Sequence, residues 1–376
     1  MGTTVRIGSA NAGTTVAEAL NIDYHLTTPA EALEQVDRSL DLLEGIVHKA
    51  GQAGCDVVAL PEGTLGLMRW ERTHPEQLGD VLPEAVARML RRLGGAAAAH
   101  DMYLICCTDV LEPWGVMRNA AFFLGRDGQE IGRYHKVNLP LHEQHKQAGD
   151  SFPVFQTPDL GGVGMLICYD MVFPEPARCL ALNGADVIFC LTMGGAAPGG
   201  EDISRAAFRT RAVENYCYLV VSWGGGNART GSMILSARGE ILVDEREPGA
   251  IAILDIDPFD GRQNADFANW QHDMRCRIFR ERRPEAYGVL TDPHPPALDR
   301  LPMYTPLPAI EIADIFSRAT TVGHVEYDHA QELVRKGEIG KAIEALEAMQ
   351  VAYPGTWFDR MAREQLPALR ERLEGT

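Results

Sequence analysis

The stretch GVGMLICYDMVFPE, residues 162–175, joins an apolar run to a cysteine and then to an acidic turn that contains proline. The apolar residues before Cys168 are typical of a buried strand. Pro176 and Gly184 stand where the first turn and the end of a following helix would lie. The stretch therefore predicts a strand, a turn and a helix in succession, which is the unit of layered α/β proteins.

The same alternation extends outward from this stretch, through about residue 256. Residues 30–51 have the apolar spacing of an amphipathic helix, and residues 119–137 predict a hairpin around Asp127 and Gly128. Further strands are predicted at residues 5–11, 55–63, 102–110, 163–170, 185–193, 217–225 and 232–245. Strands that alternate with helices of this length indicate a layered α/β fold.

The C-terminal part has a different composition. Residues 292–316 are dense in proline and mark a predicted linker, so we expect one domain at residues 1–291 and a helical tail at residues 317–376. Three runs of helical spacing in the tail are separated by Gly337 and by residues 354–356. Residues 332–356 resemble a tetratricopeptide-type hairpin. A single such unit cannot bury its own apolar face, so we expect it to pack on its own domain or on a sister subunit.

Composition and charge limit the class of partner. The chain has 376 residues and a net charge of −17, and it lacks the clustered basic surface that a nucleic acid or an anionic membrane would need. A small neutral or cationic substrate is easier to accommodate. The first residues contain no long apolar segment, so we expect a cytoplasmic protein.

The cysteine and histidine spacings give no sign of a metal. Eight cysteines are too sparse for a disulfide scaffold, and all but Cys168 are interpreted as small apolar residues of strands and helices. No pair has the spacing of a zinc or redox site, and His142 and His145 lie three apart. We therefore expect no metal. The glycine-rich stretches lack the context of a nucleotide site.

Three predicted strands end in side chains that could act together. Glu62 follows the run DVVALP, Lys136 follows IGRYH and Cys168 follows VGMLI, and each alone is more simply explained as a turn residue, a solvated lysine or a buried thiol. Together they suit nucleophilic catalysis, because a thiol needs a base within reach or a positive neighbour to become a thiolate. The dipole at the start of the following helix would stabilise the thiolate of Cys168 by about 0.3–1 kcal/mol.

These residues carry a resemblance to a known family. The segments LPEG with Glu62, YHKVNLP with Lys136 and ICYDMVFPE with Cys168 resemble the three signatures of the nitrilase, or carbon-nitrogen hydrolase, superfamily. Residues 205–222, with Arg211, Glu214 and Asn215, are similar to the stretch that follows the nucleophile in that family. The resemblance covers roughly residues 4–290. It implies a four-layer α-β-β-α fold, homo-oligomers of two or more subunits that associate through a helix face, and no cofactor.

The resemblance also implies a role for each residue. Cys168 would attack an amide-type carbon and form a thioester, with Glu62 as the base that receives the thiol proton. Lys136 and the main-chain N–H of Tyr169 would stabilise the oxyanion. Glu143 matches a second carboxylate that many members place shortly after the lysine.

Two neighbours of these residues are not assigned to catalysis. His135 precedes Lys136 on a strand and should point to the opposite face. Asp170 corresponds to a position that is usually structural in the family.

The pocket is expected in the loops that follow the strands. Tyr169, Met171 and Val172 come directly after the nucleophile, and Thr192 and Met193 follow another strand. Apolar side chains at 171 and 172 favour a neutral acyl group, because a carboxylate buried there without a cation would cost several kcal/mol. An N-carbamoyl amino acid is therefore disfavoured. Arg69 and Arg118 are the nearby cations in the sequence, and we interpret both as surface residues.

The reaction itself has alternatives. Tyr169 and Asp170 after the cysteine resemble the amidase and N-carbamoyl-amide branches of the superfamily, whereas nitrile-cleaving relatives often carry a Trp-Glu pair there. Hydrolysis of a small amide or ureido compound is therefore favoured over nitrile hydrolysis. Acyl transfer to an amine by the same three residues stays open. A catalytically silent scaffold that binds partners through the tail is disfavoured by the intact set of Glu62, Lys136 and Cys168.

Overall fold

The computed structural model of the chain describes residues 4–12, 28–68, 70–113, 115–140, 143, 145–194, 201–224, 231–260, 262, 274–301, 324–352 and 357–374. Two compact units are distinguished by their internal contacts. The first comprises Met1–Met68, Glu76–Pro140 and Lys146–Pro306, and the second comprises Arg69–Pro75, Leu141–His145 and Leu307–Thr376.

The first unit is built on two mixed six-stranded sheets. One sheet has the order β12-β1-β2-β3-β4-β5 and the other the order β11-β10-β9-β8-β7-β6. The three strands β1, β2 and β3 run parallel to one another, as do β7, β8 and β9. The strands span β1 Val5–Ala10, β2 Val57–Ala59, β3 Tyr103–Leu111, β4 Met117–Leu124, β5 Glu130–His135, β6 Val154–Thr157, β7 Gly161–Ile167, β8 Val187–Thr192, β9 Tyr218–Trp223, β10 Ser232–Leu235, β11 Ile241–Glu245 and β12 Ile251–Ile256.

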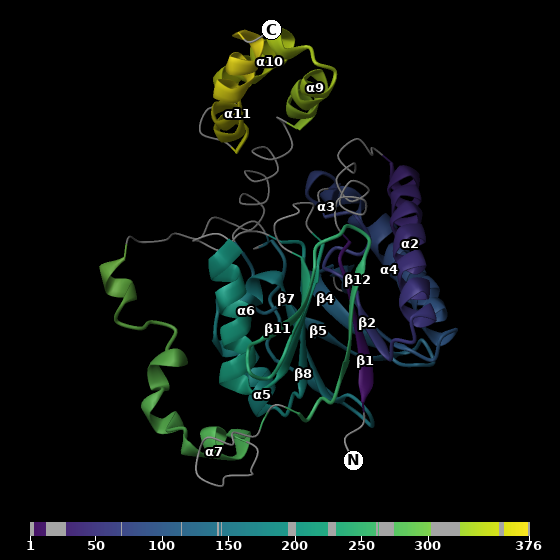
Figure 1. Cartoon of the computed structure of the whole chain (residues 1–376), viewed down its shortest axis with the longest axis vertical. Helices are drawn as coiled ribbons and strands as arrows, with labels where there is room; N and C mark the ends of the chain where they lie inside the picture. Colours follow the sequence, from purple (N-terminus) through teal and green to yellow (C-terminus); the bar gives the residue numbers. More distant parts are fainter. Residues whose placement is uncertain are drawn as a thin grey trace. The chain divides into compact units, whose positions relative to one another are not determined.

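Helices cover the outer face of each sheet. Figure 1 shows α2 (Pro29–Gln52) and α4 (Leu78–Ala98) on one side of the two sheets, and α5 (Glu175–Leu182) and α6 (Glu201–Asn215) on the other. Apolar side chains of both sheets meet in the middle, among them Ile7, Phe123, Ile167 and Phe189. This arrangement confirms the predicted four-layer α-β-β-α sandwich. The described residues of this unit also form α7 (Met274–Glu281) and the short turns η4 (Cys168–Val172), η5 (Pro284–Ala286), η6 (Gly288–Leu290) and η7 (Leu298–Arg300).

Local sequence signals account for the two long helices α2 and α4. Thr28 caps α2 in a box with Glu31, whose main-chain N–H donates to the Thr28 hydroxyl while the Glu31 carboxylate accepts from the Thr28 N–H. Helix α4 approaches the β4–β5 hairpin at Gly94 and Gly128. A side chain on Gly94 would begin 2.5 Å from the Gly128 carbonyl oxygen, so only glycine permits this contact. Gly128 has a φ of +76°, which confirms the predicted hairpin at this turn.

Buried serines fix the two sheets against each other near the ends of β1 and β2. The Ser9 hydroxyl donates to the Val221 carbonyl oxygen at 2.8 Å, and the Ser222 hydroxyl approaches the carbonyl oxygens of Ala10 at 2.9 Å and Ala59 at 3.1 Å. Ala59 lies three residues before Glu62. The relative position of the sheets is therefore set close to where the candidate side chains emerge.

The second unit contains the predicted C-terminal helices, which are α9 (His324–Arg335), α10 (Ile339–Ala352) and α11 (Trp357–Glu374), together with the short helix α3 (Trp70–Thr73). The three C-terminal helices share a small core of their own that includes Ala330, Leu346 and Leu366. Gly337, with a φ of +77°, separates α9 from α10 as expected. The predicted break at residues 354–356 and residues 302–316 of the predicted linker lie outside the described residues. The 3-10 turn η2 (Pro75–Gln77) precedes α4.

In the described part of the chain, no helix has both the length and the apolar character of a membrane span.

Candidate active site

Glu62 and Lys136 form a buried ion pair between two strand ends of the first sheet. Glu62 follows β2 and is 2% exposed, and Lys136 follows β5 and is 1% exposed. The Lys136 ammonium Nζ lies 3.0 Å from Glu62 Oε1. The structure thus brings together two residues that are 74 positions apart in the chain, as the sequence predicted.

Cys168 stands on a strained turn at the end of β7. Its φ is +44°, in the left-handed region that residues other than glycine rarely adopt. Such a conformation costs about 1–3 kcal/mol and persists only where the surroundings enforce it. Cys168 is partly exposed and packs against the cluster between the two sheets. The turn therefore presents the thiol from a rigid strand.

Asp170 is the residue that holds this turn. Its fully buried carboxylate accepts hydrogen bonds from the Ile167 N–H, the Tyr134 hydroxyl, and both the main-chain N–H and the side-chain amide of Asn138, at 2.8–3.0 Å. Burial raises the pKa of Asp170, while these donors act in the opposite direction. One carboxylate thus ties the residue before Cys168 to the segment that follows Lys136. The expectation that Asp170 is structural is confirmed by these bonds.

His135 points away from the Glu62–Lys136 pair, as expected from its position. Its ring Nε2 lies 3.6 Å from the Glu112 carboxylate, whereas Lys136 contacts Glu62. Burial lowers the pKa of His135.

The predicted pocket residues lie in three different surroundings. The ring of Tyr169 packs edge-on against Phe173, with centroids 5.4 Å apart. Met171 is buried in the cluster between the second sheet and its helices, and Val172 is 44% exposed. Contact of these three side chains with a substrate stays a prediction.

Thr192 and Met193 lie at the end of β8. The Thr192 hydroxyl accepts from the Gly194 N–H at 3.0 Å, and the Met193 N–H donates to Glu62 Oε2 at 3.3 Å. The Met193 sulfur lies 3.4 Å from where a side chain on Gly63 would begin. Met193 of the second sheet is therefore placed directly beside Glu62 of the first.

The other residues named from the sequence are placed as follows. Glu143 is buried but belongs to the second unit, so its role beside Lys136 stays a prediction. The Arg118 guanidinium donates to the Ala148 carbonyl oxygen at 2.9 Å in an exposed position, and Arg69 and His142 lie outside the described residues.

A second buried ion pair was missed by sequence reasoning. Lys146 Nζ lies 2.5 Å from Asp109 Oδ2, and both side chains are 1% exposed. Asp109 on β3 is the register partner of Asn119 on β4, and Asn119 donates to Glu62. The alternation of residues on the strand at 102–110 was the available signal, because Asp109 occupies an inward-facing position otherwise held by apolar residues.

We expect Lys146→Met to lower the free energy of unfolding by about 3–5 kcal/mol, because it leaves the buried Asp109 charge without its partner. The double variant Asp109→Leu with Lys146→Met should recover most of that loss, since both charges are removed together. Urea denaturation followed by circular dichroism measures both values. Equal destabilisation in the single and double variants would show that the pair is not the cause.

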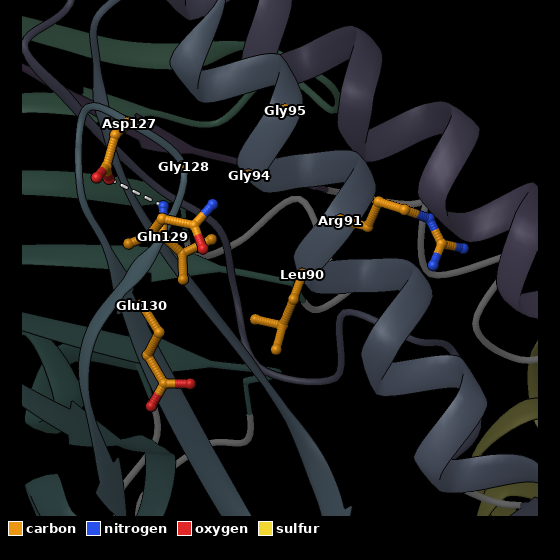
Figure 2. Close-up of a pocket in the computed structure, with 9 residues that line it drawn as sticks. Leu90, Arg91, Gly94, Gly95, Asp127, Gly128, Gln129 and Glu130 are labelled. Atoms are coloured by element: carbon orange, nitrogen blue, oxygen red, sulfur yellow. Dashed lines mark hydrogen bonds between the residues drawn. The ribbon is translucent and has the colours of Figure 1, made fainter.

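A groove of about 430 Å³ lies at the other end of β4. Figure 2 shows Leu90 and Gly94 of α4 facing Gly128 and Gln129 of the hairpin, with the Gln129 N–H donating to Asp127 Oδ1. Leu124, which also lines the groove, is five residues along the strand from Asn119, which corresponds to about 17 Å. The groove is therefore separate from the Glu62–Lys136 pair.

Comparison with known proteins gives the chain its relatives. A family model described as Carbon-nitrogen hydrolase matches residues 24–264. The chain is 28% identical over 251 residues to a deaminated glutathione amidase of Synechocystis, which covers 61% of this chain and 91% of the relative. It is 30% identical over 266 residues to a nitrilase of Pyrococcus abyssi, covering 67% and 93%, respectively. It is also 29% identical over 199 residues to the N-carbamoylputrescine amidase of Solanum lycopersicum, covering 46% and 63%.

Solved structures share the fold. An amidase from Nesterenkonia sp. AN1, in a mutant form with covalent addition of the acetamide moiety of fluoroacetamide at its active-site cysteine, superposes with a TM-score of 0.56 at 22% identity, covering 76% of this chain and 97% of that one. A carbon-nitrogen hydrolase of Helicobacter pylori G27 gives a TM-score of 0.58 at 20% identity, covering 77% and 98%.

Proposed function

This chain belongs to the carbon-nitrogen hydrolase family, and we propose that it hydrolyses a small amide or ureido compound through a thioester on Cys168. The family acts on non-peptide carbon-nitrogen bonds, so the proposal concerns the mechanism and the substrate. The observation that carries it is the buried Glu62–Lys136 pair, with the Cys168 turn fixed by Asp170 to the segment after Lys136. In the relative from Nesterenkonia sp. AN1 a cysteine carries the covalent acetamide moiety.

The proposed first half-reaction forms a carbon-sulfur bond. The Cys168 thiol gives its proton to Glu62, the sulfur attacks the carbonyl carbon, and the π electron pair moves to the oxygen. Lys136 and the Tyr169 N–H stabilise this oxyanion, a contribution of about 3–4 kcal/mol for a well-placed donor. The carbon-nitrogen bond then breaks, and the nitrogen leaves with the proton that Glu62 held.

The second half-reaction releases the acid. Water gives a proton to Glu62 and its oxygen attacks the thioester carbon, after which the carbon-sulfur bond breaks and the thiol recovers the proton. The sum is one water consumed and one acid and one amine, or ammonia, formed. Because the carboxylate of Glu62 is shielded from bulk water, the proton it accepts is directed to the leaving nitrogen.

A neutral acyl group is the proposed substrate feature. Met193 places its sulfur beside Gly63, next to Glu62, and the buried cation Lys146 is paired with Asp109. Among the residues that the structure describes, Lys136 is paired with Glu62 in the same way. An anionic acyl group beside these paired cations would be buried without a counter-ion of its own, which is unfavourable by several kcal/mol. We therefore do not propose deaminated glutathione, the compound in the name of the Synechocystis relative, as the substrate of this chain.

We expect kcat/KM to be at least tenfold higher for a neutral aliphatic amide than for the analogue with a carboxylate on the acyl side, which corresponds to about 1.4 kcal/mol. Ammonia release from a matched pair of such amides measures the ratio. If the anionic amide is preferred tenfold, the assignment of a neutral pocket is wrong, and Arg69 and Arg118 become the first residues to examine as its cation.

Nitrile hydrolysis is the second candidate, because the relative from Pyrococcus abyssi is named a nitrilase. A nitrile and the amide of the same acid distinguish the two activities by their rates of ammonia release. Acyl transfer is distinguished by whether ammonia is released without an added amine acceptor. Activity in either assay would exclude a silent scaffold.

Three further expectations remain proposals. Self-association through the outer helix face is supported by exposed apolar side chains on α5 and α6, namely Leu182, Ile203 and Val213, and sedimentation velocity would measure it. The cytoplasmic location and a reaction without a cofactor are the other two. The domain boundaries also stay a prediction, with the catalytic domain ending at residue 291 and the helical tail beginning at residue 317.

A further inference from the structure

Asn119 contacts both members of the Glu62–Lys136 pair. Its main-chain carbonyl oxygen accepts from the Lys136 N–H at 2.9 Å, and its side-chain Nδ2 donates to Glu62 Oε1 at 2.8 Å. Asn119 is 2% exposed and lies on β4, between β3 and β5. One strand residue thus sets the position of the base and of the main chain that carries the lysine.

The orientation of the Asn119 amide is fixed from the other side by Cys107. The Cys107 sulfur lies 3.2 Å from Asn119 Oδ1, in a fully buried position on β3. Burial, with the Glu62 charge nearby, raises the pKa of the Cys107 thiol well above its ordinary value, so the thiol keeps its proton and can donate. With Oδ1 occupied by a donor, the NH₂ group is directed to the carboxylate, which only accepts.

The two oxygens of Glu62 are therefore not equivalent. Oε1 accepts from Lys136 Nζ at 3.0 Å and from Asn119 Nδ2 at 2.8 Å, whereas Oε2 accepts, among the residues that the structure describes, from the Met193 N–H at 3.3 Å. A carboxylate oxygen offers about two lone-pair sites. Oε1 has both sites occupied, and Oε2 retains one.

We infer that Asn119 is a positioning residue for the proposed reaction, and that it holds Glu62 so that Oε2 receives the proton of the Cys168 thiol. The inference rests on the proposed roles of Glu62 and Cys168. Asn119 does not touch the reacting atoms. It keeps Oε1 hydrogen-bonded while the proton moves from the sulfur to Oε2 and then to the departing nitrogen.

Asn119→Leu tests the inference, because it removes the donor at similar volume and leaves the main-chain bond to Lys136 in place. We expect kcat to fall about 10–100-fold, the effect of misplacing a catalytic group by roughly 1 Å, while KM changes less than about threefold. Cys107→Ser keeps a donor to Oδ1 and should retain activity within about fivefold. Cys106→Ala is the matched control. Cys106 is equally buried and adjacent on β3, but it faces the opposite side of the sheet, so kcat should not change.

A second readout separates positioning from a general structural effect. The rate at which iodoacetamide alkylates Cys168 is measured by peptide mass spectrometry in the wild type, Asn119→Leu, Glu62→Gln and the double variant. We expect Asn119→Leu to slow alkylation about tenfold in the wild-type background and to cause no further loss beside Glu62→Gln, because coupled residues are not additive. If Asn119→Leu does not fold, Asn119→Ala replaces it in the same cycle.

The outcomes distinguish this inference from the proposed function. An unchanged alkylation rate in Asn119→Leu, or an equal loss in both backgrounds, overturns the positioning role. If Cys168 of the wild type reacts no faster than the exposed Cys276, the thiol is not activated and the proposed function itself fails. Fast alkylation of Cys168 that depends on Glu62 but not on Asn119 leaves the proposed function intact and removes the inference.

Discussion

Cys168→Ala is expected to lower kcat by more than about a thousandfold, because loss of a nucleophile removes the covalent pathway and not a single contact. The protein should stay folded, since Cys168 is partly exposed and alanine retains its Cβ. The turn around the positive φ of +44° at this residue is held by the hydrogen bonds of Asp170, which the substitution leaves in place. Ammonia release from the preferred amide, with circular dichroism as the test of folding, measures the effect.

Cys179→Ala is the matched control for this substitution. Cys179 is also a partly exposed free cysteine, but it lies on α5 and belongs to no part of the proposed site. Its activity should equal that of the wild type. If Cys168→Ala retains more than about a hundredth of the wild-type kcat, catalysis does not depend on this thiol as a nucleophile.

Glu62→Gln and Lys136→Met are each expected to lower kcat by about a thousandfold, since one removes the base and the other removes the charge that stabilises the oxyanion. The two residues share one buried ion pair at 3.0 Å, so they should act as a unit. The double variant should therefore be scarcely slower than either single variant.

The same variants have a separate effect on stability. Lys136→Met leaves the buried carboxylate of Glu62 unpaired and should lower the free energy of unfolding by about 3–5 kcal/mol, and the double variant Glu62→Gln with Lys136→Met should regain part of it. Glu130→Gln provides the control, because it breaks a more exposed ion pair with Arg133 that contributes only about 0.2–1 kcal/mol.

The kcat values of these variants also test whether the two residues act together. Multiplicative losses of kcat in the double variant would show that Glu62 and Lys136 act independently.

The fold could be predicted from the sequence because its signals are local. Apolar runs predicted where the strands lie, and the Asp127-Gly128 pair predicted the hairpin. A positive φ at Gly128 favours a residue without a side chain. The length of a strand was less predictable. The apolar run at residues 55–63 contains a strand of only three residues, Val57–Ala59. The chain leaves the sheet after this strand, and the buried Glu62 lies at the edge of the sheet.

The candidate site could be predicted only in part. Glu62, Lys136 and Cys168 were recognised because each comes at the end of a predicted strand and matches a family signature, and the structure pairs the first two. Asn119 and Asp109 were missed, because their significance depends on which strands are neighbours, and the register of β3 with β4 is a non-local property. The positive φ of Cys168 also depends on Asp170, Tyr134 and Asn138 together.

The position of Met171 shows a further limit. Its nearness to Cys168 in the sequence predicts a pocket residue, and the structure shows that the side chain at 171, on the turn η4, also packs in the cluster with Ala177 and Leu180. Met193, which comes from a different strand, lies beside Glu62 instead. Residues that line a site at strand ends come from several strands, so distance along the chain is a poor guide to them.

The central claim is that Cys168 carries the acyl group of the substrate during turnover. Acid quenching of the wild-type protein during turnover of a neutral amide, followed by peptide mass spectrometry, tests it directly. The account predicts that the peptide with Cys168 gains the mass of the acyl group, and that the gain is absent from Cys168→Ala and from a sample in which the substrate is exhausted. Steady ammonia release with no adduct on Cys168 in the quenched enzyme, or with the acyl group on another residue, would contradict it.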